Sequence, residues 1–141
     1  MNNAIEIASL GAANLAAVSI YAGLNILLLL ALGLNVSMHR RSTETSLGDG
    51  GNEKVACAVR AHGNHAEWFP GFIIGLTLAA LTAAPGYAIH GLGAVFTAAR
   101  VLHAWGLLGS AGVSFGRFAG SLLTLLCYLL LGVGLIVHAL I

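Results

Sequence analysis

Four long apolar stretches, separated by short polar breaks, make up most of this chain. They cover residues 10–38, 55–84, 87–108 and 118–141. Each is at least as long as the about 20 helical residues that cross a ~30 Å hydrocarbon core. They lack the period-two alternation of membrane β-strands, and a backbone in lipid that forms no barrel must be helical. The pattern predicts an all-α integral membrane protein, a four-transmembrane-helix bundle forming one domain over residues 1–141.

The breaks between these stretches carry typical turn residues. The first, residues 39–54, is a polar loop that contains Gly48-Asp49-Gly50-Gly51 and most of the charges. Pro85-Gly86 forms the second break, and a Gly/Ser-rich linker at residues 109–116 forms the third. Pro70 lies inside the second stretch and is expected to kink its helix.

Composition agrees with a membrane environment. Hydrophobic residues make up 58% of the chain and charged residues only 8%, too few to give a soluble domain its polar surface. The net charge of +1 argues against nucleic acid as a partner, because phosphate recognition needs clustered cations. Cys57 and Cys127 lack metal-type spacing and are expected to fill the core, so no metal site is predicted.

The basic residues predict the orientation in the membrane. All six fall in or nearest to the first and third breaks, which an even number of spans places on one side. The positive-inside rule therefore places the loop at residues 39–54 in the cytoplasm and both termini outside. These six residues are Arg40, Arg41, Lys54, Arg60, Arg100 and Arg117.

The second stretch contains polar residues at helical spacing. Arg60, Asn64 and Glu67 are spaced i, i+4 and i+7, which places them on one stripe of a helix. A charged residue inside a membrane helix costs about 2.5–3.5 kcal/mol on insertion scales, and it marks a functional site by default. This stripe must therefore face a partner helix or a water-filled cleft. His62 points away from it.

The third stretch supplies a partner for this stripe. Arg100 and His103 are spaced i and i+3, on one face of the same half of the bundle. Two interpretations remain open. Either Arg60 or Arg100 neutralises Glu67 as a structural ion pair, or these groups line a site for a polar, charged ligand. A small proton-coupled transporter that uses Glu67 is a third possibility.

The segment Arg60-Ala-His-Gly-Asn64-His-Ala-Glu67-Trp-Phe-Pro70 resembles the signature of the MAPEG superfamily. This superfamily includes microsomal glutathione transferases, leukotriene-C synthase, microsomal prostaglandin E synthase and the five-lipoxygenase-activating protein. Ala99-Arg100-Val-Leu-His103 is similar to a second family segment, and the Arg40-Arg41 pair has its counterpart. The resemblance covers essentially the whole chain and is greatest to short bacterial members.

This resemblance implies a homotrimer that binds glutathione between subunits, near the cytoplasmic face of a bacterial inner membrane. Glutathione has two carboxylates and one ammonium group. An arginine can clamp a carboxylate bidentately, and a glutamate can receive the ammonium group. By motif position the binding residues are Arg60, Asn64 and Glu67, with His103, Arg100, His62 and Arg41 as further candidates.

The implied activity is that of a glutathione transferase or peroxidase acting on lipophilic electrophiles or lipid hydroperoxides. The implied partners are copies of the same chain, membrane lipids and lipophilic small molecules. Arg117, immediately before the fourth stretch, is the candidate that the resemblance implies for stabilising the thiolate of glutathione. A non-enzymatic lipid-binding or scaffold protein is the alternative. Leu107 favours it, because the animal enzymes carry a tyrosine there and Trp105 is the nearest aromatic residue.

Overall fold

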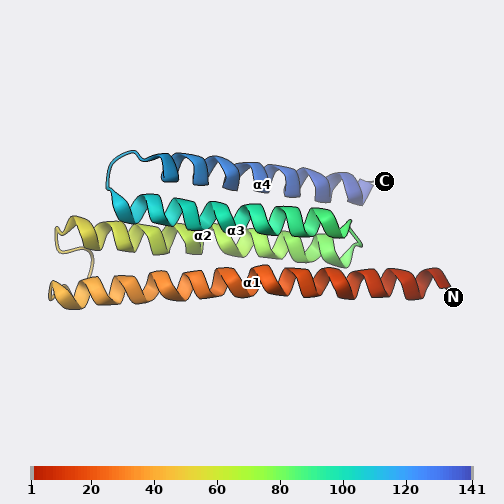
Figure 1. The fold of residues 1–141 in the computed structure, drawn as a ribbon, viewed down its shortest axis with the longest axis horizontal. Coiled ribbons are helices and arrows are strands. Elements are labelled where there is room, and N and C mark those ends of the chain that lie inside the picture. The colour runs from red at the N-terminus through yellow and green to blue at the C-terminus, as the bar shows by residue number, and fades with distance from the viewer. Residues whose placement is uncertain (1, 141) are drawn as a thin grey trace.

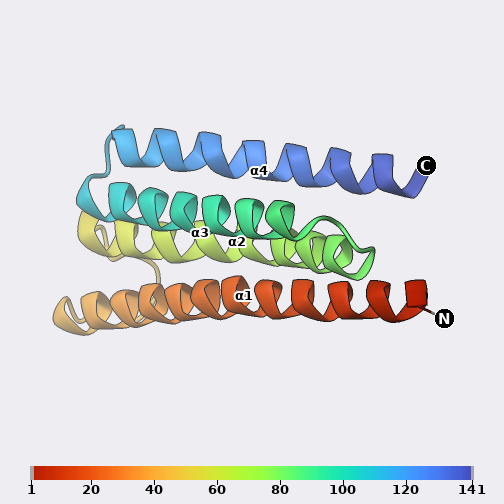
Figure 2. The same ribbon diagram turned by 45° about the vertical axis from the view of Figure 1, so that its right-hand side comes forward.

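The computed structural model describes residues 2–140, with side chains from residue 9 onward. Its four helices are α1 (Asn2–Ser42), α2 (Glu53–Leu81), α3 (Gly86–Gly109) and α4 (Phe115–Leu140). They lie side by side and alternate in direction, so that both ends of the chain lie at one end of the bundle (Figures 1 and 2). No strand occurs within residues 2–140, and the predicted all-α fold is confirmed.

Three of the helices are long and apolar enough to cross a membrane. They are α1 over Ser9–Ser42, α3 and α4. The 29-residue helix α2 is also long enough, but the polar residues of its first half lower its hydropathy. Helix α2 lies alongside the other three over nearly its whole length (Figure 1). Wherever those helices cross the bilayer, α2 therefore crosses it with them. The molecule is thus a four-helix membrane bundle.

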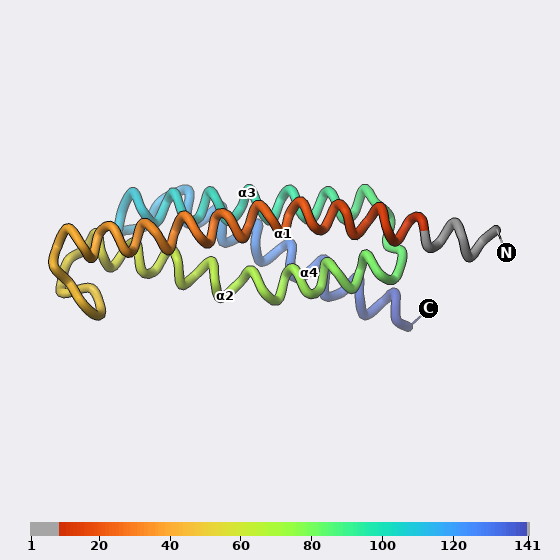
Figure 3. Tube along the Cα trace, turned by 90° about the horizontal axis from the view of Figure 1, so that it is seen from below, coloured from red at the N-terminus to blue at the C-terminus, as the bar shows by residue number. Residues whose placement is uncertain are grey.

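Helices α2 and α3 form the middle of the bundle. Helix α1 packs on both of them and lies over the seam between them (Figure 3). Helix α4 packs mainly on α3 and also on α2, while α1 and α4 make no contact over the described residues. We call the end that carries residues 43–52 and 110–114 the loop end, and the opposite one the terminal end.

Helix α1 extends beyond the apolar stretch that predicted it. The stretch ends at Met38, whereas the helix continues to Ser42. Positive side chains near a helix C-terminus interact favourably with the helix dipole, so basic residues do not end a helix there. The last turn of α1 contains His39, Arg40 and Arg41.

Helix α2 begins at a capped N-terminus. The side-chain oxygen of Asn52 accepts hydrogen bonds from the backbone amides of Lys54 and Val55, at 3.0 and 3.3 Å. In the preceding loop, Arg40 Nη2 donates to the carbonyl of Gly48 at 3.0 Å. The predicted glycine turn is present, with positive φ at Gly48, Gly50 and Gly51.

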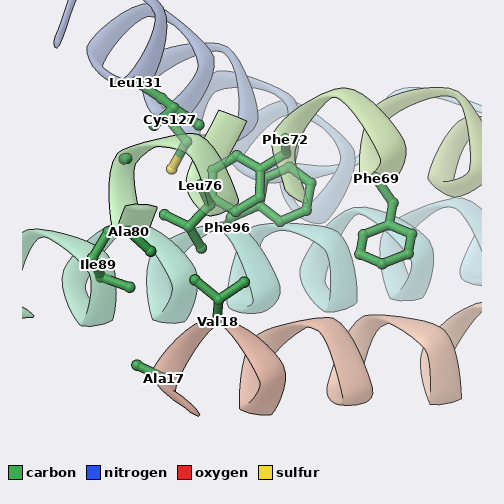
Figure 4. Close-up of a cluster of buried hydrophobic side chains, with 11 residues drawn as sticks. Ala17, Val18, Phe69, Phe72, Leu76, Ala80, Ile89, Phe96, Cys127 and Leu131 are labelled. Atoms are coloured by element: carbon green, nitrogen blue, oxygen red, sulfur yellow. The ribbon is translucent and has the colours of Figure 1, made fainter. Parts of the chain in front are cut away.

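The core has two parts. Near the terminal end, the rings of Phe72 and Phe96 stack with centroids 3.7 Å apart (Figure 4), and aliphatic side chains from all four helices surround them. Near the loop end, a smaller cluster joins α1, α2 and α3. Its buried residues are Leu32, Ala61, Ala104 and Leu107.

Glycines allow α3 and α4 to approach within backbone contact. A methyl group at Gly120 would lie 2.6 Å from the carbonyl oxygen of Ala99, and one at Gly116 would lie 2.8 Å from that of Leu102. One at Gly106 would lie 2.6 Å from the amide nitrogen of Arg117. Small residues at helix contacts are the usual means of close packing in lipid, where the hydrophobic effect does not drive association.

We expect Gly120→Ala to destabilise the protein, because the added methyl group must push α4 away from α3. Overpacking of this kind costs about 1–3 kcal/mol. Gly132→Ala is the matched control, since no heavy atom lies within 4 Å of a methyl group at that position. Thermal unfolding in detergent should show a lower midpoint for Gly120→Ala alone. Equal midpoints for the two variants would contradict this packing.

Candidate functional site

An ion pair lies on the exposed face of α2. Arg60 Nη1 is 3.4 Å from Glu67 Oε1, and the two side chains are 60% and 56% exposed. Arg60 reaches Glu67 across Gly63, where a methyl group would lie 3.8 Å from Arg60 Nη1 and 4.0 Å from Glu67 Oε1. Two of the three residues predicted to share a stripe are thus joined directly.

Asn64, the third residue of the stripe, bonds to Arg100 of α3. Arg100 Nη2 donates to Asn64 Oδ1 at 2.6 Å, and Arg100 Nη1 donates to the hydroxyl of Thr124 in α4 at 3.4 Å. The Arg100 side chain is only 1% exposed, and its buried Nε has no hydrogen-bond partner among the described residues. Three helices therefore converge on one buried guanidinium.

These contacts answer the question of which arginine neutralises Glu67. Within the described part of the chain the one ion pair joins Arg60 to Glu67, and Arg100 hydrogen-bonds to neutral groups. A buried cation is usually paired with an anion, because removing an unpaired charge from water is costly. No carboxylate of the described residues lies within ion-pair distance of Arg100, although the charge of Glu67 acts on it from farther away.

A cavity of about 240 Å³ lies beside this guanidinium, between α2, α3 and α4. Its lining combines polar and apolar side chains, so it offers hydrogen-bonding groups next to a hydrophobic wall. The lining residues are Asn64, Trp68, Arg100, Ser121, Thr124 and Leu125.

His103 lies on the same side of α3 as Arg100, one turn nearer the loop end. It is 6% exposed, and its buried Nδ1 has no partner in residues 9–140. Arg100, Arg117 and Arg60 all lie near enough for their charges to act on the imidazole. Positive charges from three helices thus act on this position.

The structure does not join the remaining binding candidates to this network. His62 points toward α1, where its Nε2 is 3.5 Å from the position of a methyl group on Gly33. Arg41 lies exposed in the last turn of α1. No hydrogen bond or ion pair seen in the described residues connects either side chain to Arg60, Asn64 or Glu67.

Arg117 binds the linker between α3 and α4. Its Nη1 donates to the carbonyl oxygen of Ala111 at 2.9 Å and also to that of Gly112. Leu107, where the resemblance implies a tyrosine in the animal enzymes, is 7% exposed within the loop-end core, and Trp105 is 69% exposed. The structure therefore joins Arg60 to Glu67 and Asn64 to Arg100, whereas the side chain of the catalytic candidate Arg117, in the first turn of α4, is bonded to the linker backbone.

Sequence reasoning did not find the contribution of α4. Thr124 bonds Arg100, and Ser121 lines the cavity. Both are isolated hydroxyl residues in an apolar stretch, and their spacing of three places them on one face of the helix. This spacing was the sequence signal that could have identified a polar face on α4.

The sequence also matches known proteins. A model of the MAPEG family matches residues 18–137. The inner membrane protein YecN of Escherichia coli K12 and its counterpart in Escherichia coli O6:H1 are each 32% identical to this chain over 88 residues. These residues are 62% of this chain and 67% of YecN. The resemblance seen in the segment from Arg60 to Pro70 is confirmed, and the chain belongs to the MAPEG family.

Proposed function

We propose that this chain is a glutathione-binding protein of the bacterial inner membrane. In this proposal it is an enzyme that transfers glutathione to lipophilic electrophiles or uses it to reduce lipid hydroperoxides. The site consists of Arg60, Asn64 and Glu67 of α2 with Arg100 and His103 of α3. Membership of the MAPEG family supports a membrane protein, and the description of YecN as an inner membrane protein supports the inner-membrane location.

The exposed ion pair between Arg60 and Glu67 carries this proposal. Glu67 lies 14 residues into α2, or about 21 Å along the helix axis, and the span predicted over residues 55–84 puts it well inside the membrane. A charged pair more than half exposed on a single protomer cannot face lipid without a large penalty. A neighbouring protein surface and a polar ligand together would cover it.

The chemistry of glutathione suits this arrangement. Arg60 and the buried Arg100 each offer a planar guanidinium to a carboxylate, and Glu67 offers a carboxylate to the ammonium group. Asn64 presents an amide beside Arg100. Two cationic positions and one anionic position thus match the two carboxylates and one ammonium of the ligand.

A second copy of the chain is the partner that best covers the ion pair. The MAPEG resemblance implies a homotrimer, with each site between neighbouring subunits. The lipophilic substrate would arrive from the bilayer, where the exposed faces of α1 and α4 meet lipid. The thiolate would form near Arg117 once its guanidinium leaves the linker carbonyls, and otherwise near Arg100 and His103.

Two observations favour a second candidate function, that of a non-enzymatic lipid-binding or scaffold protein. Leu107 is buried in the core and offers no hydroxyl group to a thiol. The Arg117 guanidinium already binds two carbonyl groups of the linker. A protein with these features could bind glutathione without activating it.

Calorimetric titration of the purified protein with glutathione in detergent tests the proposal. The wild type should bind, and Arg60→Ala should weaken binding about tenfold or more, because it removes a charge-assisted hydrogen bond. Lys54→Ala is the matched control: it removes the same unit charge from the first turn of α2, and it should leave affinity unchanged. A wild type that does not bind glutathione would refute the proposed function.

A further inference from the structure

A polar cluster that the proposed site does not use lies in the middle of the bundle. His65 of α2 is fully buried, and its Nε2 donates to the backbone carbonyl of Asn25 in α1 at 3.0 Å. The Asn25 side chain is 1% exposed, and its Nδ2 donates to the Tyr21 carbonyl and to the Thr97 hydroxyl of α3, at 2.9 and 2.8 Å. One side chain of α2 is thus fixed to the backbone of α1.

The partners of this cluster are incomplete. Because a carbonyl oxygen can only accept, His65 uses its Nε2–H, and its Nδ1 is left as an acceptor without a donor. Asn25 Oδ1 likewise has no partner among the described residues. An unpartnered buried polar atom lowers stability, and an apolar side chain would avoid this loss. Stability alone therefore does not explain a histidine here.

The position of His65 in α2 suggests its role. Asn64, which bonds Arg100, is its immediate neighbour in the chain. Pro70 lies five residues later, and because proline has no N–H, the carbonyl of Ala66 lacks its intrahelical donor. The helix is therefore less constrained by its own hydrogen bonds directly after His65.

External contacts bracket this weak segment. His65 holds it to α1 on one side, and the ring also stacks on Phe69 with centroids 5.7 Å apart. On the other side, the Tyr128 hydroxyl of α4 donates to the backbone carbonyl of Trp68. The segment that carries Asn64 and Glu67 is thus fixed by side chains of neighbouring helices.

We propose that His65 is a positioning residue: its bond to the Asn25 carbonyl sets the rotation of α2, so that Asn64 meets Arg100. Loss of the Nε2 donor removes the side-chain bond that holds α2 to α1 at this level, and a small rotation of α2 near Pro70 then separates Asn64 from the guanidinium. The expected effect of His65 on glutathione affinity rests on the proposed function. The expected effect on the hydrogen bond between Asn64 and Arg100 is independent of that function.

Nitrogen NMR of the Arg100 guanidinium in the ligand-free protein tests this role. In the wild type the hydrogen bonds to Asn64 and Thr124 should shift its resonances from those of a free arginine. His65→Leu should move them toward the free position, and His65→Gln, which keeps an amide donor, should restore them. If His65→Leu does not fold, His65→Phe removes the donor while keeping a ring against Phe69.

Asn14→Leu is the matched control. Asn14 is 5% exposed, and its Nδ2 donates to the backbone carbonyl of Ala84 at 2.8 Å, so the variant removes a similar bond at the terminal end. Its Arg100 resonances should match the wild type. Unchanged Arg100 resonances in the folded variant without the donor, or a failure of His65→Gln to restore them, would overturn the proposal.

Glutathione affinity is a second measurement on the same variants. His65→Leu should weaken binding about fivefold or more, within the range of coupling between contacting residues, while its unfolding midpoint stays near that of the wild type. A large fall in the midpoint with unchanged Arg100 resonances would make His65 merely structural and would overturn the proposal. If the wild type does not bind glutathione, the proposed function fails, and the Arg100 resonances still decide the role of His65.

Discussion

Replacing Arg117 by alanine should lower the rate of glutathione conjugation about tenfold or more, with glutathione affinity nearly unchanged. A cation near the sulfur stabilises the thiolate and not the neutral thiol, and one unit of thiol pKa corresponds to about 1.4 kcal/mol. To act in this way, the guanidinium must exchange the carbonyls of Ala111 and Gly112 for the sulfur. Initial rates with an aryl halide, beside calorimetric Kd values, measure the two effects separately.

Arg117→Lys is the control, because it keeps the charge and should retain most of the activity. Ultraviolet absorbance of the thiolate on adding glutathione reports ionisation directly. Full activity of Arg117→Ala would move the thiolate stabiliser to Arg100, His103 or Arg41. A wild type that binds glutathione without forming thiolate, and that turns over no electrophile, would establish the scaffold function instead.

A reporter that is active only in the periplasm should be fully active when fused after Ile141 and silent when inserted near Gly50. The loop at residues 43–52 and the linker at residues 110–114 lie at one end of the bundle, and the chain termini lie at the other (Figure 1). By the positive-inside rule, the basic residues of the loop, together with Arg117, predict that the loop end faces the cytoplasm.

A reporter that fluoresces only in the cytoplasm, inserted at the same two positions, provides the complementary control. Each position should then give a signal with one of the two reporters, which shows that fusions at both positions are produced. The cytoplasmic reporter should fluoresce near Gly50 and stay dark after Ile141. The opposite pattern in both reporters would invert the bundle and place Arg60 and Arg100 in the outer half of the membrane.

The fold was largely predictable because hydropathy and turn residues both act locally. Pro85-Gly86 and the glycines of the first loop stand where the helices break. The apolar stretch missed the last turn of α1, because hydropathy reports immersion in lipid, whereas helical structure continues through Arg41 into water. The start of α2 depends on the two hydrogen bonds of the Asn52 cap, which a hydropathy profile does not register.

The site was predictable along each helix but not between helices. Helical spacing placed Arg60, Asn64 and Glu67 on one stripe, and two of them pair directly. That Arg100 bonds Asn64 rather than Glu67 depends on the rotation of α3 about its axis. A helix that is apolar on nearly every side gives no periodic signal for that rotation, so the contact required the three-dimensional structure.

Over the residues that the structure describes, α1 and α4 do not touch, and this bears on how the chain assembles. Every helix packs on the next one in the sequence, so most contacts join segments close together along the chain. Pairing of helices that are neighbours in the sequence closes only short loops, which favours rapid formation of these contacts. The chain can therefore enter the membrane as two successive hairpins, α1 with α2 and then α3 with α4. The stacked rings of Phe72 and Phe96 would close the junction last, after synthesis of the second hairpin.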